Sequence, residues 1–274
     1  DIHPVFKEMA KKAKAVYSLC DPALTDALEF TDGKLMFGKH KVLKEITWER
    51  CKEHMGGVKN IAAMIGNCNL FGMENWTMIP NMSSIWEGLI DEVFPLMETP
   101  DKKPLAFFDL ADPEKRTKGD ILRAMELIGN FSEKFRTVLG LNEKELYEIT
   151  EVFGITTDAA SNPEEKLRKA VLDTYGRLGI YCLAVHPTKE ATCCLGGEFF
   201  RTAGPYCANP ALTTGAGDNF NAGFCLGMAL ELDPLSALTL GVATSGFYVR
   251  NAKSPSYPQV IDFISKWDKG EITD

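Results

Sequence analysis

Short apolar runs that alternate with amphipathic segments constrain the fold of this chain more than any other feature. The runs lack the polar alternation of a strand with one solvated face, so they indicate strands that are covered on both faces. Such strands, alternating with helices, predict a doubly wound α/β fold with a mostly parallel sheet and helices on both faces. The strand candidates are Ala15–Leu19, Cys68–Met73, Leu105–Leu110, Arg136–Leu141 and Ile180–His186, followed by a hairpin-like pair, Thr192–Leu195 and Glu198–Arg201.

Start signals for helices lie between the apolar runs. Asn162-Pro163 and Asp233-Pro234 each supply a capping side chain followed by a proline in the first helical position. A last helix is expected near Pro258–Trp267. No internal repeat or clear linker interrupts the pattern, which favours one domain over residues 1–274.

Two segments of the N-terminal region carry further expectations. The chain starts at Asp1 without a Met, which indicates that an N-terminal segment is missing. Residues 23–45 contain alternating strand-like pieces around Asp32-Gly33, a hairpin signal. We therefore expect a small lid or edge hairpin in that region.

Composition excludes several classes of partner. The chain has 274 residues, of which 45% are hydrophobic, and a net charge of -8 without a cluster of Lys and Arg. An acidic chain of this kind is a poor binder of nucleic acid or anionic membranes, and no apolar run reaches transmembrane length. The eight cysteines show no C-x-x-C spacing, which favours free thiols and a cytoplasmic location.

The densest chemistry lies at Thr213–Gly223, which reads TTGAGDNFNAG. Gly215 and Gly217 allow a tight turn, and the N–H groups at the start of the following helix can seat a phosphate. Asp218 lies in the first turn of that helix. A carboxylate there suits a reaction in which a hydroxyl loses its proton while a phosphoryl group arrives. A residue that simply matches the helix dipole explains Asp218 equally well.

This segment resembles the C-terminal signature of the ribokinase/PfkB carbohydrate kinases, D-T-x-G-A-G-D-x-F-x-A-G. The resemblance implies a ribokinase-like fold, ATP as phosphoryl donor and Asp218 as catalytic base. It also implies an anion hole at Gly215–Gly217 and nucleotide contacts at Thr213 and Thr214. The leading Asp of the signature is Leu212 here, which counts against a requirement for a monovalent cation. The matching residues are Thr213, Gly215, Ala216, Gly217, Asp218, Phe220, Ala222 and Gly223.

A second match is Asn142 followed three residues later by Glu145, after the predicted strand Arg136–Leu141. The family carries an N-x-x-E motif at this place, which acts through water on the magnesium that accompanies the nucleotide. The same spacing is that of a helix capping box, and the two roles can coexist.

Two weaker matches and one departure from the family pattern lie elsewhere. The stretch Phe107–Arg116, which includes Asp109, loosely resembles the family's D-P-N-x-R, and strand-end acids of an open α/β sheet fall where ligands bind. Surface loop chemistry explains these acids almost as well. Asn251 lies in a segment that resembles the loop bordering the adenine, although turn chemistry also explains that segment. Where the family usually has T-x-G, this chain has Val185-His186-Pro187-Thr188, and His186 is expected to be a structural residue at a strand end.

The sequence therefore predicts a Mg²⁺-dependent kinase that transfers a phosphoryl group from ATP to a hydroxyl of a sugar or sugar-like alcohol. Ala27–Phe30 and Gly140–Glu143 look slightly like the ADP-dependent sugar kinases, which are the first alternative. A non-catalytic nucleotide- or sugar-binding regulator and a kinase of vitamin precursors are the others. The expected partners are a small sugar and a nucleotide, and a homodimer is left open.

Overall fold

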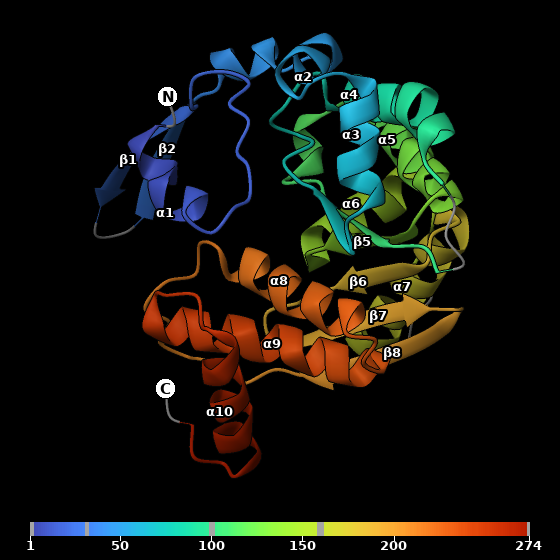
Figure 1. Cartoon of the computed structure of the whole chain (residues 1–274). Helices are drawn as coiled ribbons and strands as arrows, with labels where there is room; N and C mark the ends of the chain where they lie inside the picture. The colour runs from blue at the N-terminus through green and yellow to red at the C-terminus, as the bar shows by residue number, and fades with distance from the viewer. Residues whose placement is uncertain (1–2, 31–32, 99–101, 158–161, 273–274) are drawn as a thin grey trace. The chain divides into compact units, whose positions relative to one another are not determined.

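The computed structural model describes residues 3–30, 33–98, 102–157 and 162–272 (Figure 1). The chain divides into two compact units, each of which is described by itself. The smaller unit comprises residues 1–68 and 75–101, and the larger comprises residues 69–74 and 102–274. A single kinase domain over residues 1–274 stays a prediction.

The larger unit is built on a six-stranded sheet in the order β3-β4-β5-β6-β7-β8. The first four strands are parallel, and β7 and β8 continue the sheet antiparallel. The prediction of a mostly parallel sheet is therefore confirmed. β7 and β8 form the predicted hairpin, and the Gly196-Gly197 turn connects them. The strands are β3 (Leu70–Met73), β4 (Leu105–Asp109), β5 (Arg136–Leu141), β6 (Cys182–Val185), β7 (Glu190–Leu195) and β8 (Glu198–Ala203).

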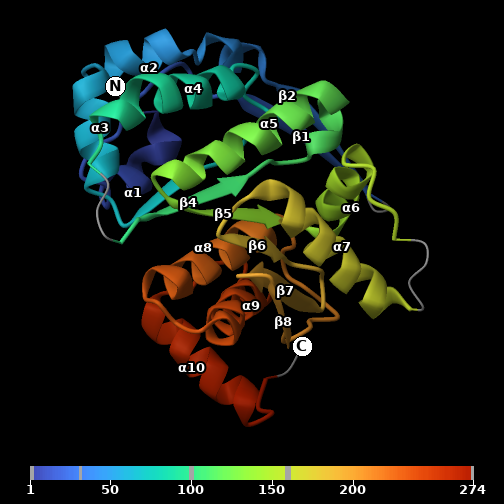
Figure 2. The ribbon, with the colours of Figure 1, turned by 90° about the vertical axis from the view of Figure 1, so that its right-hand side faces the viewer.

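Helices cover both faces of this sheet. Figure 2 shows α5, α6 and α7 on one side and α8 and α9 on the other. The helices are α5 (Lys118–Asn130), α6 (Glu143–Val152), α7 (Pro163–Leu178), α8 (Ala216–Ala229), α9 (Pro234–Asn251) and α10 (Tyr257–Asp268), with short 3₁₀ turns at Pro113–Lys115 and Phe131–Glu133.

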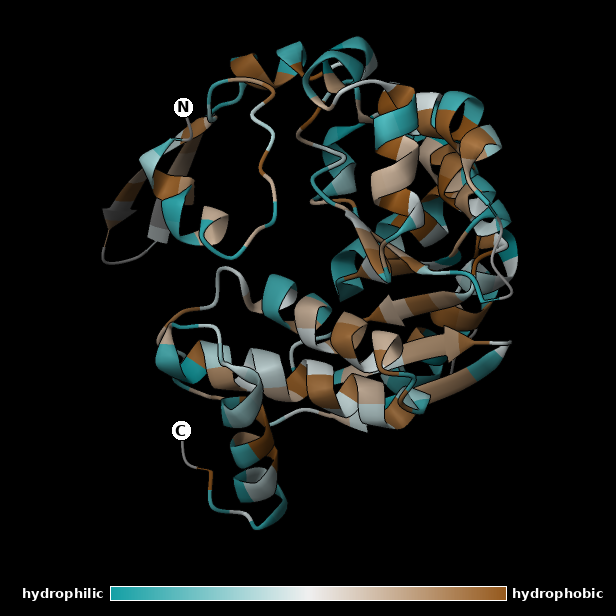
Figure 3. Cartoon of the chain, viewed as in Figure 1, coloured by the Kyte–Doolittle hydropathy of each residue, from teal (hydrophilic) through white to brown (hydrophobic). Residues whose placement is uncertain are grey.

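Neighbouring residues of the central strands enter two different cores. Phe107 packs with Phe220 and Phe224 of α8, whereas the next residue, Phe108, meets Phe131 edge-on at 4.9 Å between ring centroids. Both faces are buried, as the continuous apolar runs predicted. Figure 3 shows the result as strands β6 and β7 that are hydrophobic along most of their length.

The smaller unit holds a two-stranded sheet and short helices. β1 pairs antiparallel with β2 within the segment for which the sequence predicted a hairpin, and its role as a lid stays a prediction. Asp32 of the predicted turn lies outside the described residues. The elements are η1 (Pro4–Phe6), α1 (Lys7–Ala10), β1 (Leu24–Phe30), β2 (Gly33–Lys39), η2 (Lys41–Glu45), α2 (Trp48–His54), α3 (Val58–Gly66), α4 (Met82–Gly88), a π-helical turn η3 (Leu89–Val93) and η4 (Phe94–Leu96).

One predicted strand is wrong. Residues Ala15–Leu19 form no strand, and they are exposed or only partly buried. An apolar run of five residues becomes a strand only where another strand is available to bond its backbone, and the sequence does not reveal that partner.

Two further expectations concern the whole chain. All eight cysteines are free thiols, and five of them are buried. Within the described ranges, no helix combines the length and the apolar character needed to cross a bilayer.

Candidate active site

The glycine-rich turn precedes α8 as the sequence predicted. Gly215 is the N-cap residue of α8 and has a φ of 91°, a left-handed conformation that favours glycine. The Tyr248 hydroxyl of α9 donates a hydrogen bond to the Thr214 carbonyl at 2.7 Å. A Cβ at Gly215 would lie 2.8 Å from that hydroxyl oxygen. Both the backbone angle and the close approach of Tyr248 therefore require glycine here.

The N-terminus of α8 differs from those of α6, α7 and α9. In those helices a side chain accepts N–H groups of the first turn, whereas no side chain caps α8. The amide of Ala216, one of the three predicted for the anion hole, donates to the Thr213 carbonyl at 3.1 Å. Asp218 lies in this first turn and is exposed. An uncapped helix start with the positive end of the dipole suits an anion, and a carboxylate beside it is free to meet a ligand.

A cavity of about 370 Å³ adjoins this turn. That volume lies within the ~300–1,000 Å³ typical of small-molecule sites. Asn142 at the start of α6 lines the cavity, and so do Thr213, Ala216 and Gly217 of the glycine-rich turn. The other lining residues come from the segment after β6, the first residue of β7, the segment after β8, and helices α8 and α9: His186, Pro187, Thr188, Glu190, Gly204, Pro205, Tyr206, Cys207, Pro210, Phe220, Val242, Ser245, Gly246 and Val249.

Asn251 does not belong to this group. It is the last residue of α9, its side-chain amide donates to the Phe247 carbonyl at 2.8 Å, and it is exposed. It is not among the residues that line the cavity. Its predicted contact with a nucleotide thus has no support from this geometry.

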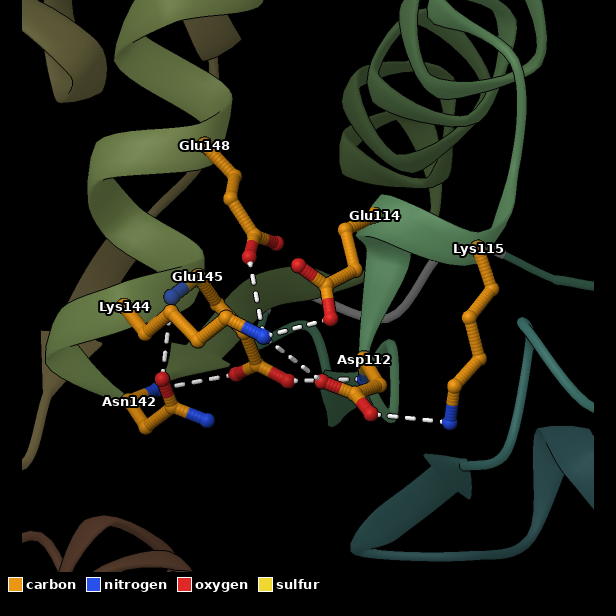
Figure 4. Close-up of polar contacts among 7 residues, drawn as sticks. All are labelled: Asp112, Glu114, Lys115, Asn142, Lys144, Glu145 and Glu148. Atoms are coloured by element: carbon orange, nitrogen blue, oxygen red, sulfur yellow. Dashed lines mark hydrogen bonds and ion pairs between the residues drawn. The ribbon is translucent and has the colours of Figure 1, made fainter.

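Asn142 and Glu145 form a capping box at the start of α6 (Figure 4). The Asn142 side-chain oxygen accepts the Glu145 amide, and one Glu145 carboxylate oxygen accepts the Asn142 amide, both at 2.9 Å. The second carboxylate oxygen accepts the Asp112 amide, also at 2.9 Å. Glu145 therefore ties α6 to the segment after β4, and each of its oxygens already accepts a hydrogen bond.

Burial raises the pKa of Glu145, and the two N–H donors of Asn142 and Asp112 partly oppose that rise. In the described part of the chain, no group of three His, Cys, Asp or Glu residues is arranged to hold a metal ion. Mg²⁺ commonly keeps several waters and binds through few carboxylates together with substrate phosphates. A magnesium ion that arrives with a nucleotide and contacts this pair through water is compatible with these side chains.

Three polar residues lie near Asp218, and of these the sequence pointed only to Asp109, as a strand-end acid. Asp109 ends β4, and its carboxylate accepts the Ala111 amide at 2.9 Å and the side-chain amide of Asn221 at 2.8 Å. Desolvation raises the pKa of Glu74, which follows β3, and the charges of Asp109 and Asp218 raise it further. Glu74 follows the predicted strand Cys68–Met73, Asp109 lies near the end of the predicted strand Leu105–Leu110, and Asn221 lies inside the glycine-rich signature. Position near a strand end was therefore the usable signal for the two acids.

The raised pKa of Asp109 predicts that the stability of the protein depends on pH. Burial raises its pKa, the Ala111 amide opposes that rise, and the Asp218 charge adds to it. The folded chain thus binds this proton more tightly than the unfolded chain, so the contribution of Asp109 to stability is present at low pH and is lost as the pH rises through its folded pKa. We expect Asp109→Asn to gain in Tm relative to the parent as the pH rises from about 4 to 7.

Asp233→Asn is the matched control for that measurement. Its carboxylate accepts from Ser236 and from backbone amides at the start of α9, which lowers its pKa. Its contribution to stability is lost as the pH falls, so this variant should lose Tm relative to the parent as the pH rises. A difference between Asp109→Asn and the parent that is constant with pH would contradict the pKa assigned to Asp109.

Comparison with known proteins identifies the family of the chain. A family model described as prokaryotic ketohexokinase matches residues 1–267. The chain belongs to this family. A ketohexokinase of Haloferax volcanii is 27% identical over 248 residues, which cover 90% of this chain and 64% of that relative. The family match thus extends across the region before β4.

Solved structures confirm the ribokinase-like fold of the chain. The fructokinase of Xylella fastidiosa with bound ATP has a TM-score of 0.66 and 14% identity, covering 92% of this chain and 76% of that one. The ribokinase of Arabidopsis thaliana in complex with ribose and ATP has a TM-score of 0.65 and 16% identity, covering 89% and 70%. The resemblance to the ribokinase/PfkB family that the glycine-rich signature carried is confirmed.

Proposed function

We propose that this chain transfers a phosphoryl group from ATP to a hydroxyl of a ketohexose, with Asp218 as the general base. The observation that carries the proposal is Asp218 in the uncapped first turn of α8, in a chain of the prokaryotic ketohexokinase family. Ala216 and Gly217 of the same turn line a cavity of ligand size, although Asp218 itself is not among its lining residues. The printed names of relatives supply the sugar class and the donor, since ATP is bound in the fructokinase and ribokinase structures.

The chemistry divides between the turn and the cavity. The phosphates of ATP lie over the Gly215–Gly217 turn, where the helix dipole favours their charge. Asp218 takes the proton of the accepting hydroxyl as the phosphoryl group arrives. Thr213 and Thr214 border the nucleotide. Asn142 and Glu145 would hold a magnesium ion through water, and the ion would offset the charge of the phosphates.

A panel of donors and acceptors tests this function. Purified protein is assayed with ATP or ADP as donor, and with fructose, other ketohexoses, glucose or ribose as acceptor. We expect turnover with ATP and ketohexoses, and the phosphorylated sugar is identified by mass spectrometry. Turnover with ADP in place of ATP would favour the ADP-dependent alternative, and nucleotide binding without any turnover would favour a non-catalytic regulator.

A cytoplasmic location stays a prediction.

The proposed contact of Asn142 and Glu145 with magnesium leads to a separate prediction. Glu145→Ala should raise the magnesium concentration needed for half-maximal activity, because it removes the carboxylate that orders Asn142 and the Asp112 backbone. Loss of the cap alone costs about 1 kcal/mol of stability. The measurement is a magnesium titration of turnover, with Glu143→Ala as control, since Glu143 is exposed in the same helical turn. Superimposable magnesium curves for Glu145→Ala and the parent would remove the metal role.

A further inference from the structure

The last turn of α9 holds the segment that leads from β8 to the glycine-rich turn. Helix α9 lies beside α8 (Figure 1). The Val249 carbonyl, one of the last four of α9, accepts the Ala211 amide at 2.7 Å. The Arg250 guanidinium donates to the Pro205 carbonyl at 2.9 Å and to the Tyr206 carbonyl at 2.7 Å. Two successive residues of α9 therefore hold this segment at two places along its length.

Tyr248, the residue before Val249, adds a contact with the glycine-rich turn itself. Its hydroxyl donates to the Thr214 carbonyl at 2.7 Å. The Tyr248 side chain is half-buried, and Tyr248 is not among the residues that line the cavity beside the turn. Tyr248 therefore contacts the backbone of the turn without lining the space that a ligand would fill.

Three successive carbonyls of the turn each accept a hydrogen bond. The Ala216 amide donates to the Thr213 carbonyl at 3.1 Å. Asn219 donates to the Gly215 carbonyl through its backbone amide at 3.1 Å and through its side-chain amide at 2.8 Å. Both of these donors belong to α8, whereas the donor to the middle carbonyl, that of Thr214, comes from α9. The orientation of the middle peptide unit thus depends on a side chain of a different helix.

That orientation also decides where the Gly215 N–H points. The peptide bond between Thr214 and Gly215 is trans, so the Gly215 N–H points opposite to the Thr214 carbonyl. The hydrogen bond from Tyr248 to this carbonyl therefore directs the Gly215 N–H away from Tyr248. Gly215 is the N-cap residue of α8, at the end of the helix where N–H groups and the dipole favour an anion. Because glycine restricts its own backbone angles least, an external donor is needed to hold this unit in one direction.

We propose that Tyr248 is a positioning residue for phosphoryl transfer, and that its hydroxyl directs the Gly215 N–H towards a phosphate oxygen of ATP at the N-terminal turn of α8. The assignment rests on the proposed function, because it takes ATP as the ligand of that turn. Tyr248 contacts neither ATP nor the accepting hydroxyl in this role. It acts through Gly215, so its effect falls on the phosphates of the donor and not on the adenosine part.

Two tyrosine substitutions test this role. Tyr248→Phe keeps the ring and removes the hydroxyl. Tyr175→Phe is the matched control, because Tyr175 is a half-buried tyrosine of α7 whose hydroxyl meets the backbone of Gly196 and Gly197, in the turn between β7 and β8. Calorimetry measures the Kd of each variant for ATP and for adenosine, which has no phosphate. We expect Tyr248→Phe to raise the Kd for ATP about threefold to tenfold, the range for one neutral hydrogen bond, and to leave the Kd for adenosine unchanged. Tyr175→Phe should leave both values unchanged.

Kinetics separate positioning from a purely structural role. At saturating ATP, the kcat of Tyr248→Phe should fall about tenfold, which is less than the roughly 10²–10³ that loss of a whole anion-hole donor costs. The KM for the ketohexose should stay at the parent value. A purely structural role would lower Tm and leave the kcat of the folded protein unchanged.

Several outcomes would overturn the assignment. An unchanged Kd for ATP or a normal kcat in Tyr248→Phe would do so, as would the same losses in Tyr175→Phe. Equal losses for ATP and adenosine would also overturn it, because they would indicate damage to the cavity. If the parent binds ATP but phosphorylates no sugar, the proposed function fails, and the two Kd values still decide the role of Tyr248. A parent that binds no ATP overturns both.

Discussion

Asp218→Asn is expected to lower kcat by about 10²–10⁴ while the protein stays folded. That loss corresponds to roughly 3–5 kcal/mol of activation barrier. Asn keeps the size of the side chain but cannot take a proton from a hydroxyl. The fold should tolerate the change, because Asp218 is exposed and no side chain caps α8. The measurements are kcat, the Kd for ATP and Tm on this one variant.

The affinity for ATP separates catalysis from binding. Removal of a negative charge beside the phosphate seat should leave the Kd for ATP unchanged or improve it. Asp233→Asn, which alters the acid at the start of the neighbouring helix α9, is the control and should keep normal turnover. If Asp218 only matches the helix dipole, kcat of Asp218→Asn will stay within about threefold of the parent, which is under about 1 kcal/mol of barrier.

Gly223→Ala is expected to destabilise the protein through the contact between α8 and α9. A Cβ at Gly223 would lie 2.7 Å from the Leu240 carbonyl oxygen and 2.5 Å from the Thr244 hydroxyl, which donates to that same carbonyl. The carbonyl belongs to the backbone of α9, so the two helices must separate. Overpacking of this kind typically costs about 1–3 kcal/mol.

The same substitution at Gly176 is the control that separates the overpacking cost of Gly223→Ala from the general effect of replacing a helical glycine by alanine. Gly176 lies in the interior of α7, is exposed, and has no atom within 4 Å of an added Cβ. Gly176→Ala should stabilise the protein by about 0.4–1 kcal/mol, because alanine restricts the unfolded chain. Urea unfolding and Tm compare both variants with the parent. A Gly223→Ala protein as stable as Gly176→Ala would show that α8 and α9 pack more loosely than the Gly223 contact implies.

The large elements were predictable because their patterns are local. A continuous apolar run such as Arg136–Leu141 identifies a doubly covered strand without knowledge of its neighbours, and Asn162-Pro163 marks the start of α7 by itself. The Ala15–Leu19 run shows the limit of that reasoning. It has the composition of a strand, but strand formation depends on a partner that is distant in sequence.

The same distinction between local patterns and distant contacts decides which site residues were predictable. The glycine-rich signature located Asp218 and the uncapped turn, since both lie within one short stretch of sequence. Asp109 and Asn221 are 112 residues apart and meet only because β4 and α8 lie side by side in the fold. The approach of the His186 ring to Gly217 likewise depends on the fold, and no sequence pattern records it.

Transfer of a radiolabelled γ-phosphate from ATP to fructose, followed with the parent and with Asp218→Asn at equal concentrations, tests the central claim most directly. Labelled sugar phosphate should form with the parent, at a rate about 10²–10⁴ times that of the variant. No labelled sugar from a parent that binds ATP, or equal rates of labelling by the two proteins, would contradict the account.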